Sequence, residues 1–326
     1  MEFAAPLESK FYTVPRETEF NMTGPSKEPG LNWNTKYGYV YLDYFDSKHP
    51  VDGMNEKGLS FGFLFFPSPQ QKFPSVPQGD EKQALPYTNI GDWLLGNFAT
   101  IEEVKTGLQN VKIFANPESF PGKPNAVFPI HVTVTDATGK SLVIEFINGK
   151  QYVFNNPNGV LTNAPNLDWQ LTNIKNYINL SPYQPKPLTI DGYTYSATGN
   201  GSGAIGLPGD YSPQSRFVKM IFATQSAIPA KSAFETVLLA QHILNTVDIP
   251  QGLVRSKLGK GDSIETTQWV IYKDLDSKIL YYKTYDNTNL KAIDLNKINF
   301  KKGTYPLTMP LISPMQVNDV TKQFHK

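Results

Sequence analysis

The fold is decided by residues 128–154, FPIHVTVTDATGKSLVIEFINGKQYVF. Three runs in this stretch are rich in β-branched and aromatic residues, which is typical of strands. The runs are residues 128–135, 141–146 and 151–154. A five-residue turn, Asp136–Lys140, separates the first two, and Asn148-Gly149 separates the last two. Asn-Gly favours a tight hairpin because both of its residues tolerate positive φ. We therefore predict a meander of at least three antiparallel strands.

Two other parts of the sequence also predict strands. Residues 267–272 and 279–284 form a second hairpin pattern around a turn at 273–278. At the start, residues 10–15, KFYTVP, are typical of a strand that ends at a proline.

Helix starts are marked by two capping boxes, Thr100 with Glu103 and Ser232 with Glu235, in which each side chain bonds the other residue's backbone N–H. After the second box, an apolar stripe with helical spacing contains one polar residue. The stripe is Phe234, Val237, Leu238, Gln241 and Leu244. Further helices are predicted at residues 87–98, 168–178 and 215–224. Strands first and last, with helices between them, predict an α+β fold with antiparallel sheets, in one domain over residues 1–326.

Composition excludes several classes of function. The 326 residues carry a net charge of +1, so nothing favours nucleic acid or an anionic membrane as a partner. No run of 18 apolar residues predicts a membrane span. The sequence has no cysteine, which excludes disulfides and thiolate ligands within it. Its four histidines lack metal-type spacing, so we expect no metal site.

An amide side chain stands out in residues 158–170, NGVLTNAPNLDWQ. Asn163 follows an apolar strand end and precedes a proline by two residues. At the rim of a sheet, its amide could donate a hydrogen bond to an oxyanion. The alternative is an Asx turn or a helix cap.

A cation stands out in residues 199–217, GNGSGAIGLPGDYSPQSRF. Gly201, Gly203 and Gly206 have the spacing of a dinucleotide fingerprint, but Leu-Pro-Gly-Asp follows them where a helix is required. We predict instead a close-packed loop that delivers Arg216 at the start of a helix, the alternative being a solvated charge. An amide and a cation together suit the anionic transition state of acyl transfer, although no nucleophile is evident.

Four segments occur together in one known family. They are VDGMNEKGL (51–59), LTNAPNLDWQLTN (161–173), GLPGDYSPQSRFV (206–218) and TTQW (266–269). A fifth, DWLLGNFAT (92–100), matches the family's W-x-L-G segment and the short helix after it. Along nearly its whole length, the sequence resembles the choloylglycine hydrolase family, which includes bile-salt hydrolases and penicillin V acylases.

The resemblance implies an N-terminal-nucleophile hydrolase, a four-layer αββα sandwich of two antiparallel sheets faced by helices. In such enzymes the mature chain begins with cysteine, whose thiol attacks a linear amide while its α-amino group acts as base. The family's second strand carries a motif like Gly-Arg-Thr-Met-Glu-Phe, and this sequence begins with Met-Glu-Phe. We therefore expect Met1 to match an internal methionine, about twenty residues after the nucleophile. The alternative is a diverged member that has lost catalysis.

The resemblance also assigns roles to residues. Glu2 matches the acidic residue that holds the α-amino group, Asn163 the oxyanion-hole asparagine, and Arg216 the arginine beside the nucleophile. Tyr87 lies near the family's further Asn or Tyr site residue. The aromatic run 61–66, with Phe73, is the candidate grip for an apolar acyl group, and core packing is the alternative. Within this run, Phe61 and Phe65 are the chosen candidates.

Two functions compete at this point. The first is hydrolysis of a linear amide with an apolar acyl group: a conjugated bile salt, penicillin V or an N-acyl homoserine lactone. The second is binding of such an amide without cleavage, since the sequence has no cysteine. The resemblance further implies no cofactor, a homotetramer or homodimer, and export to the periplasm.

Overall fold

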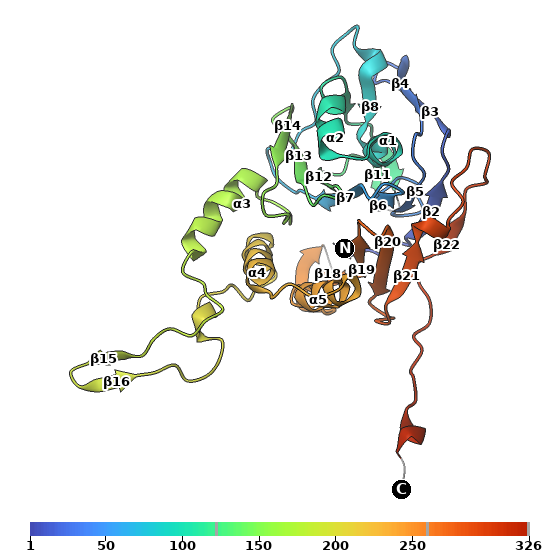
Figure 1. Ribbon diagram of the computed structural model, residues 1–326. Helices are drawn as coiled ribbons and strands as arrows, with labels where there is room; N and C mark the ends of the chain where they lie inside the picture. Colours follow the sequence, from blue (N-terminus) through green and yellow to red (C-terminus); the bar gives the residue numbers. More distant parts are fainter. Residues whose placement is uncertain (121–122, 259–260, 325–326) are drawn as a thin grey trace.

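A computed structural model describes residues 1–120, 123–258 and 261–324. Figure 1 shows four layers. Helices α1 (Ile90–Asn97) and α2 (Ile101–Leu108) cover a large sheet, a second set of strands lies below it, and helices α4 (Pro213–Ser226) and α5 (Ala233–Asn245) cover the opposite face. The predicted α+β, αββα architecture is confirmed.

The upper sheet has eight strands in the order β14-β13-β12-β7-β6-β5-β2-β22, and every neighbouring pair is antiparallel. Its strands in chain order are β2 (Lys10–Val14), β5 (Tyr39–Leu42), β6 (Asp52–Asn55), β7 (Ser60–Phe65), β12 (Ile130–Thr135), β13 (Ser141–Ile147), β14 (Lys150–Asn155) and β22 (Thr308–Pro310). The predicted meander is its β12-β13-β14 edge. In its second turn, Asn148 and Gly149 have φ of +51° and +74°, as a tight hairpin requires.

The lower strands form two groups, β1-β18-β17 and β19-β20-β21. Their bounds are β1 (Glu2–Phe3), β17 (Val254–Leu258), β18 (Gly261–Thr267), β19 (Trp269–Asp274), β20 (Ile279–Thr284) and β21 (Lys291–Asp294). Only Gln268 separates β18 from β19, so they run as one strand. The predicted late hairpin is β19-β20.

Shorter elements complete the described chain. The small strand pairs are β3 (Glu19–Thr23) with β4 (Pro29–Asn34), β8 (Ala84–Pro86) with β9 (Lys112–Phe114), β10 (Glu118–Phe120) with β11 (Lys123–Ala126), and β15 (Leu188–Ile190) with β16 (Tyr193–Tyr195). Helix α3 spans Leu167–Asn173, and 3-10 turns occur at Glu81–Gln83, Tyr87–Asn89, Ile174–Tyr177, Ser202–Ala204, Leu295–Lys297 and Thr321–Gln323. No helix in the described ranges is long and apolar enough to cross a membrane.

The capping predictions have different outcomes. Thr100 and Glu103 form the complete capping box. Ser232 accepts from the Glu235 backbone N–H, but the Glu235 carboxylate accepts from the N–H of Lys231 instead of Ser232. The stripe on α5 is also less buried than its spacing indicates, since Phe234 is 55% and Leu238 is 38% exposed.

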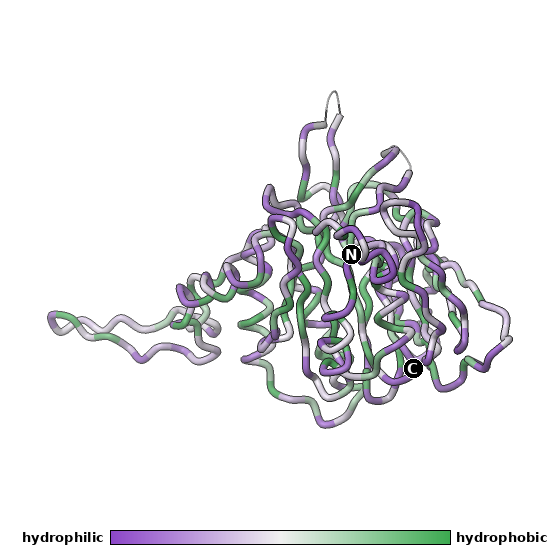
Figure 2. The backbone as a smooth tube through the Cα atoms, turned by 90° about the horizontal axis from the view of Figure 1, so that it is seen from above, coloured by the Kyte–Doolittle hydropathy of each residue, from purple (hydrophilic) through white to green (hydrophobic). Residues whose placement is uncertain are grey.

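An arm of residues 181–205, with the β15-β16 hairpin at its tip, projects from the body (Figures 1 and 2). Residues 181–187 lie at its base and are largely exposed. The prediction of a close-packed glycine-rich loop holds only at Gly203, where a Cβ would come within 1.9 Å of the Tyr183 carbonyl oxygen; the rest of residues 199–206 runs along the arm, exposed or half-exposed. Exposed apolar side chains on the arm are Tyr183, Leu188, Ile190, Tyr193 and Tyr195.

A buried carboxyl group in α1 makes folding stability depend on pH. Asp92 accepts hydrogen bonds from Tyr39 (2.7 Å) and Asn89 (3.0 Å), yet burial outweighs both and raises its pKa from 3.8 to about 6. The folded chain therefore holds this proton more tightly than the unfolded chain does. The proton on Asp92 therefore stabilises the folded chain fully below pH 4. This stabilisation is lost as the pH rises from 4 to 6, and above pH 6 Asp92 causes no further change of stability with pH.

We predict that Asp92→Asn removes this dependence. The change should flatten the stability profile between pH 4 and pH 6 by up to about 3 kcal/mol relative to the parent chain. Urea unfolding midpoints of both chains at pH 4, 5, 6 and 7 measure it. A difference between the chains that stays constant with pH would show that Asp92 does not titrate in this range.

Candidate active site

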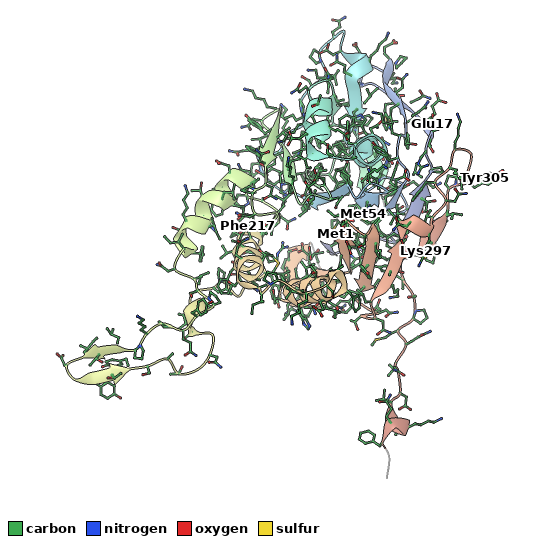
Figure 3. All side chains as sticks on the ribbon, viewed as in Figure 1. Met1, Glu17, Met54, Phe217, Lys297 and Tyr305 are labelled. Atoms are coloured by element: carbon green, nitrogen blue, oxygen red, sulfur yellow. The ribbon has the colours of Figure 1, made fainter. Side chains whose placement is uncertain are left out.

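The first three residues pair with the lower strands. Glu2 lies opposite Thr267 in the β1-β18 pair, and the Gln268 N–H donates to the Met1 carbonyl at 2.9 Å. The Met1 amino group donates to the Trp269 carbonyl at 2.7 Å. Figure 3 shows the result: Met1 lies between the two sheets, facing the interior of the sandwich.

Arg216 connects the two other predicted polar residues. It comes from the first turn of α4, where Pro213 occupies an early position that needs no backbone donor. Its Nη2 donates to Asn163 Oδ1 at 2.5 Å, and its Nη1 lies 4.0 Å from Glu2 Oε2. The Arg216 side chain is 13% exposed, so this guanidinium is a partly buried cation and not a solvated surface charge.

The orientation of the Asn163 amide follows from these partners. A guanidinium can only donate, so the oxygen of the amide must face Arg216. The amide nitrogen then faces the Phe65 carbonyl, to which it donates at 2.6 Å. An NH₂ group has two hydrogens, and among the described residues only this one bond uses them. The second hydrogen can therefore serve an incoming oxyanion. Asn163 lies in a loop after β14 rather than at a strand end.

Glu2 is an anion in this cluster. Burial raises its pKa, but the positive charges of the Met1 amino group and Arg216, together with its hydrogen bonds, outweigh burial and lower the pKa below its ordinary value. The Thr267 hydroxyl donates to its Oε1 at 3.4 Å, and the Met1 nitrogen lies 3.9 Å from the same oxygen. A carboxylate therefore stands beside the Arg216 cation.

An apolar pocket opens next to this cluster. Its cavity volume is about 60 Å³, and it is partly open to solvent. The pocket is lined by Met1, Phe3, Leu7, Tyr44, Phe45, Val51, Phe63, Leu64, Phe65, Tyr87, Phe128 and Ile130. Phe65 joins the pocket to the polar cluster, because its side chain lines the pocket while its carbonyl accepts from Asn163.

The aromatic candidates divide between pocket and core. Tyr87 and Phe65 line the pocket, whereas Phe61 does not. Phe61 is fully buried and lies under α1, where a Cβ on Gly91 would come within 2.6 Å of its ring. For Phe61 the core alternative therefore holds. Phe73 packs in the core on Tyr87 and Phe146 at ring-centroid distances of 4.9 and 4.5 Å.

Sequence reasoning missed two features here. The first is the part of the pocket outside the predicted run 61–66: Phe128 and Ile130 line it beside Phe63 and Leu64 of that run, and the apolar start of β12 was the available signal. The second feature is an ion pair between the sheets: Lys273 Nζ on β19 lies 2.8 Å from Asp52 Oδ1 on β6. Its hydrogens point to Ser60 Oγ (2.9 Å) and the Phe61 carbonyl (3.0 Å). Burial, the largest effect, raises the pKa of Asp52 although Lys273 lowers it.

The chemistry that this arrangement supports is acyl transfer at the pocket mouth. An amide hydrogen, a guanidinium and a carboxylate converge where an acyl group could leave the apolar pocket. Within the described ranges, no cluster of three or more His, Asp or Glu side chains is placed to bind a metal ion.

Comparison with known proteins identifies relatives along most of the chain. It is 36% identical to a bile salt hydrolase/transferase of Clostridium perfringens, over 81% of this chain and 79% of the relative. It is 26% identical to a penicillin V acylase of Pectobacterium atrosepticum, over 92% of this chain and 77% of that protein.

Solved structures agree. A variant of the conjugated bile acid hydrolase from Clostridium perfringens superposes with a TM-score of 0.83 and 32% identity, covering 98% of this chain and 94% of that one. Penicillin V acylase from Agrobacterium tumefaciens, at 24% identity and a TM-score of 0.76, shares the fold over 96% of this chain and 86% of its own. Residues 1–309 match the family described as linear amide C-N hydrolases, choloylglycine hydrolase family. The chain therefore belongs to the choloylglycine hydrolase family.

Proposed function

We propose that this protein hydrolyses linear amides whose acyl half is apolar, with the acyl group in the pocket and the scissile bond at the Asn163–Arg216 cluster. The observation that carries the proposal is the continuous path from apolar pocket to oriented amide. Phe65 lines the pocket, its carbonyl fixes Asn163, and Asn163 is held by Arg216. In the tetrahedral intermediate, the spare amide hydrogen would bind the oxyanion.

In this proposal the nucleophile comes from outside the sequence described, which has no cysteine. The backbone around Gln268 supports a place for it. The Gln268 carbonyl accepts from the Tyr285 N–H, and the next carbonyl, that of Trp269, accepts from Met1; because successive carbonyls of an extended strand point to opposite sides, β1 and β20 lie on opposite sides of the β18-β19 strand. Among the described residues, the β1 side of β19 beyond Trp269 has no paired strand. A groove of about 570 Å³ lies along β19 there, with Val237 and Ala240 of α5 in its lining.

A strand that continued β1 into this groove would consist of residues that precede Met1. A further strand paired with it would lie beside Glu2 and Arg216. Arg216 would favour the thiolate form of a cysteine placed there. Glu2 would hold the α-amino group and stabilise the ammonium ion that forms when this group takes up a proton. The proposed roles are therefore Glu2 for the amine, Asn163 for the oxyanion, Arg216 for the nucleophile, and Tyr87 and Phe65 for the acyl group.

Substrate choice follows from the pocket lining. An apolar pocket with polar groups only at its mouth suits an amide that is apolar on the acyl side and polar on the amine side. Penicillin V, glycine- or taurine-conjugated bile salts and N-acyl homoserine lactones share this pattern. The relatives named above act on the first two.

Two measurements test the proposal. The intact mass and N-terminal residue of the protein from its native host establish whether a cysteine precedes the sequence described. Amine release from the three substrate classes is then measured for that protein and for the chain beginning at Met1. Hydrolysis by the first and none by the second supports the proposal. If a protein with an N-terminal cysteine releases no amine from any of them, the proposal fails.

The alternative function is binding of the same amides without cleavage, favoured by the absence of cysteine from the sequence. Titration calorimetry with the chain beginning at Met1 tests it directly. Saturable binding of an intact amide, recovered unchanged afterwards, supports a binding protein if the native protein also begins at Met1.

We also propose that the protein is a homo-oligomer in which a second copy covers the arm. Exposed apolar side chains gather at its tip, including Tyr193 and Tyr195. Such a surface is typical of an interaction site. The double variant Tyr193→Ser with Tyr195→Ser should lower the mass measured by light scattering to that of a smaller assembly. Tyr305→Ser, at a still more exposed tyrosine outside the arm, is the control. A parent chain that is already monomeric would contradict the proposal.

A further inference from the structure

The histidine–glutamate pair between β12 and β13 lies completely out of solvent. His131 and Glu145 side chains are both 0% exposed, and His131 Nδ1 lies 3.2 Å from Glu145 Oε1. Their strands are neighbours, and the pair lies one step beyond the Val132–Ile144 register pair. A buried polar pair of this kind is costly unless its atoms find partners, and three of its four nitrogen and oxygen atoms do, while Glu145 Oε2 has none among the described residues. Its partners therefore indicate its role.

Both partners of the pair belong to the loop that carries Asn163. His131 Nε2 lies 2.8 Å from the Thr162 carbonyl, immediately before Asn163. Glu145 Oε1 accepts from the Leu167 backbone N–H at 2.9 Å, where α3 begins. The pair thus fixes both ends of residues 162–167, which restricts the backbone conformation of the loop between them.

The same histidine is connected to the two other groups that fix Asn163. The Thr162 hydroxyl donates to the Pro213 carbonyl at 3.0 Å, in the first turn of the helix that carries Arg216. The ring of Phe66 stacks on the His131 ring at 4.7 Å, and Phe66 directly follows the residue whose carbonyl accepts from Asn163. His131 therefore contacts elements on both sides of the oxyanion amide.

Proton counting shows that the pair acts as a unit. A carbonyl only accepts, so His131 Nε2 must carry a hydrogen toward Thr162. Between His131 Nδ1 and Glu145 Oε1 there must then be one further proton, since two lone pairs would repel. The pair is neutral overall, either as imidazolium with carboxylate or as imidazole with carboxylic acid. This neutrality is compatible with its complete burial.

We infer that His131 and Glu145 are positioning residues for the oxyanion amide of Asn163. They act on the reaction through the 162–167 loop and touch no reacting atom. The inference rests on the proposed function for its catalytic consequence, but its structural content can be tested without turnover.

The most informative substitution for testing this role is Glu145→Gln, which keeps the shape of the side chain and removes the proton shared with His131. A neutral amide oxygen can accept from both Leu167 and Nδ1 while Nε2 keeps its hydrogen only if His131 carries an uncompensated positive charge in complete burial, so we expect one of the three bonds to be lost. The control is Val132→Ala, beside His131 on β12, where a fully buried apolar side chain is truncated.

Hydrogen exchange and kinetics are measured on the parent and on both variants. For Glu145→Gln we expect exchange of the 162–167 amides to rise about tenfold, with little change elsewhere. In the nucleophile-bearing protein we expect kcat to fall about tenfold at nearly constant KM. Val132→Ala should lower the melting temperature without either effect.

The outcomes separate the two proposals. Unchanged loop exchange in Glu145→Gln, or an equal rise in Val132→Ala, would overturn the positioning role. If the loop loosens as expected while the cysteine-bearing parent never releases amine, the proposed function fails and the positioning of Asn163 stands.

Discussion

Replacing Arg216 with alanine, in the form of the protein that carries its nucleophile, is expected to lower kcat/KM at least about a hundredfold, as loss of an oxyanion-hole donor does. The reason is that one guanidinium serves two groups. Its Nη2 fixes the Asn163 oxygen at 2.5 Å, and its Nη1 faces Glu2 at 4.0 Å. Alanine would release the amide to rotate and would leave the Glu2 carboxylate without its nearest side-chain cation.

The matched control for this variant is Arg255→Ala. Arg255 is also an arginine near a carboxylate, 4.0 Å from Asp262, but its side chain is 61% exposed on β17. It should leave amide hydrolysis unchanged. Arg216→Lys tests geometry, because one ammonium cannot reproduce two separate contacts of a planar fork. A lysine variant with full activity would show that only the charge at position 216 matters.

Asn163→Ala should cause a similar loss, and the double variant should be hardly worse than either single change. Groups that act as a unit give strongly non-additive effects. Amine-release kinetics of the two single variants and the double variant measure this coupling. Additive losses would mean that Arg216 does not act through Asn163, and the site assignment would need revision.

Lys273→Ala is expected to produce the largest loss of folding stability, about 3 kcal/mol at pH 7, the lower end of the range for a buried ion pair, because the Asp52 side chain is still 20% exposed. Lys273 links the two sheets by bonding Asp52, Ser60 and the Phe61 carbonyl, and its side chain is 12% exposed. Without it, the Asp52 carboxylate would remain between the sheets with no cation beside it. Urea unfolding, followed by fluorescence, measures the loss.

Burial rather than distance decides the size of this effect. Lys257 and Asp262 are closer, at 2.6 Å, but the lysine is 87% exposed, so Lys257→Ala should change stability by less than about 0.5 kcal/mol. The double variant Asp52→Asn with Lys273→Ala removes both charges and should recover much of the single-variant loss. If it is no more stable than Lys273→Ala alone, the loss comes from packing and not from the unpaired carboxylate.

Much of the fold could be predicted because its signals are local. The alternation and turn residues of 128–154 define three strands without reference to the rest of the chain, and Thr100 with Glu103 defines a helix start. The convergence of Glu2, Asn163 and Arg216 followed from the family resemblance. No local pattern joins residues that are more than two hundred positions apart in the sequence.

The remaining features depend on tertiary contacts that no spacing encodes. Phe61 and Phe65 belong to the same aromatic strand, yet Phe61 lies under α1 and Phe65 lines the pocket. His131 and Asp52 gave no signal because each finds its partner across a strand pair or between sheets. The arm was misjudged since glycines permit both a packed loop and an exposed one.

The position of Met1 has a practical consequence for every protein that these experiments require. Its amino group bonds the Trp269 carbonyl between the sheets, so residues fused before it would have to start inside the sandwich. The other end is different: residues 312–324 are largely exposed and lead away from the body in Figure 1. Affinity tags and surface-immobilisation handles therefore belong after Lys326, where they leave the candidate site untouched.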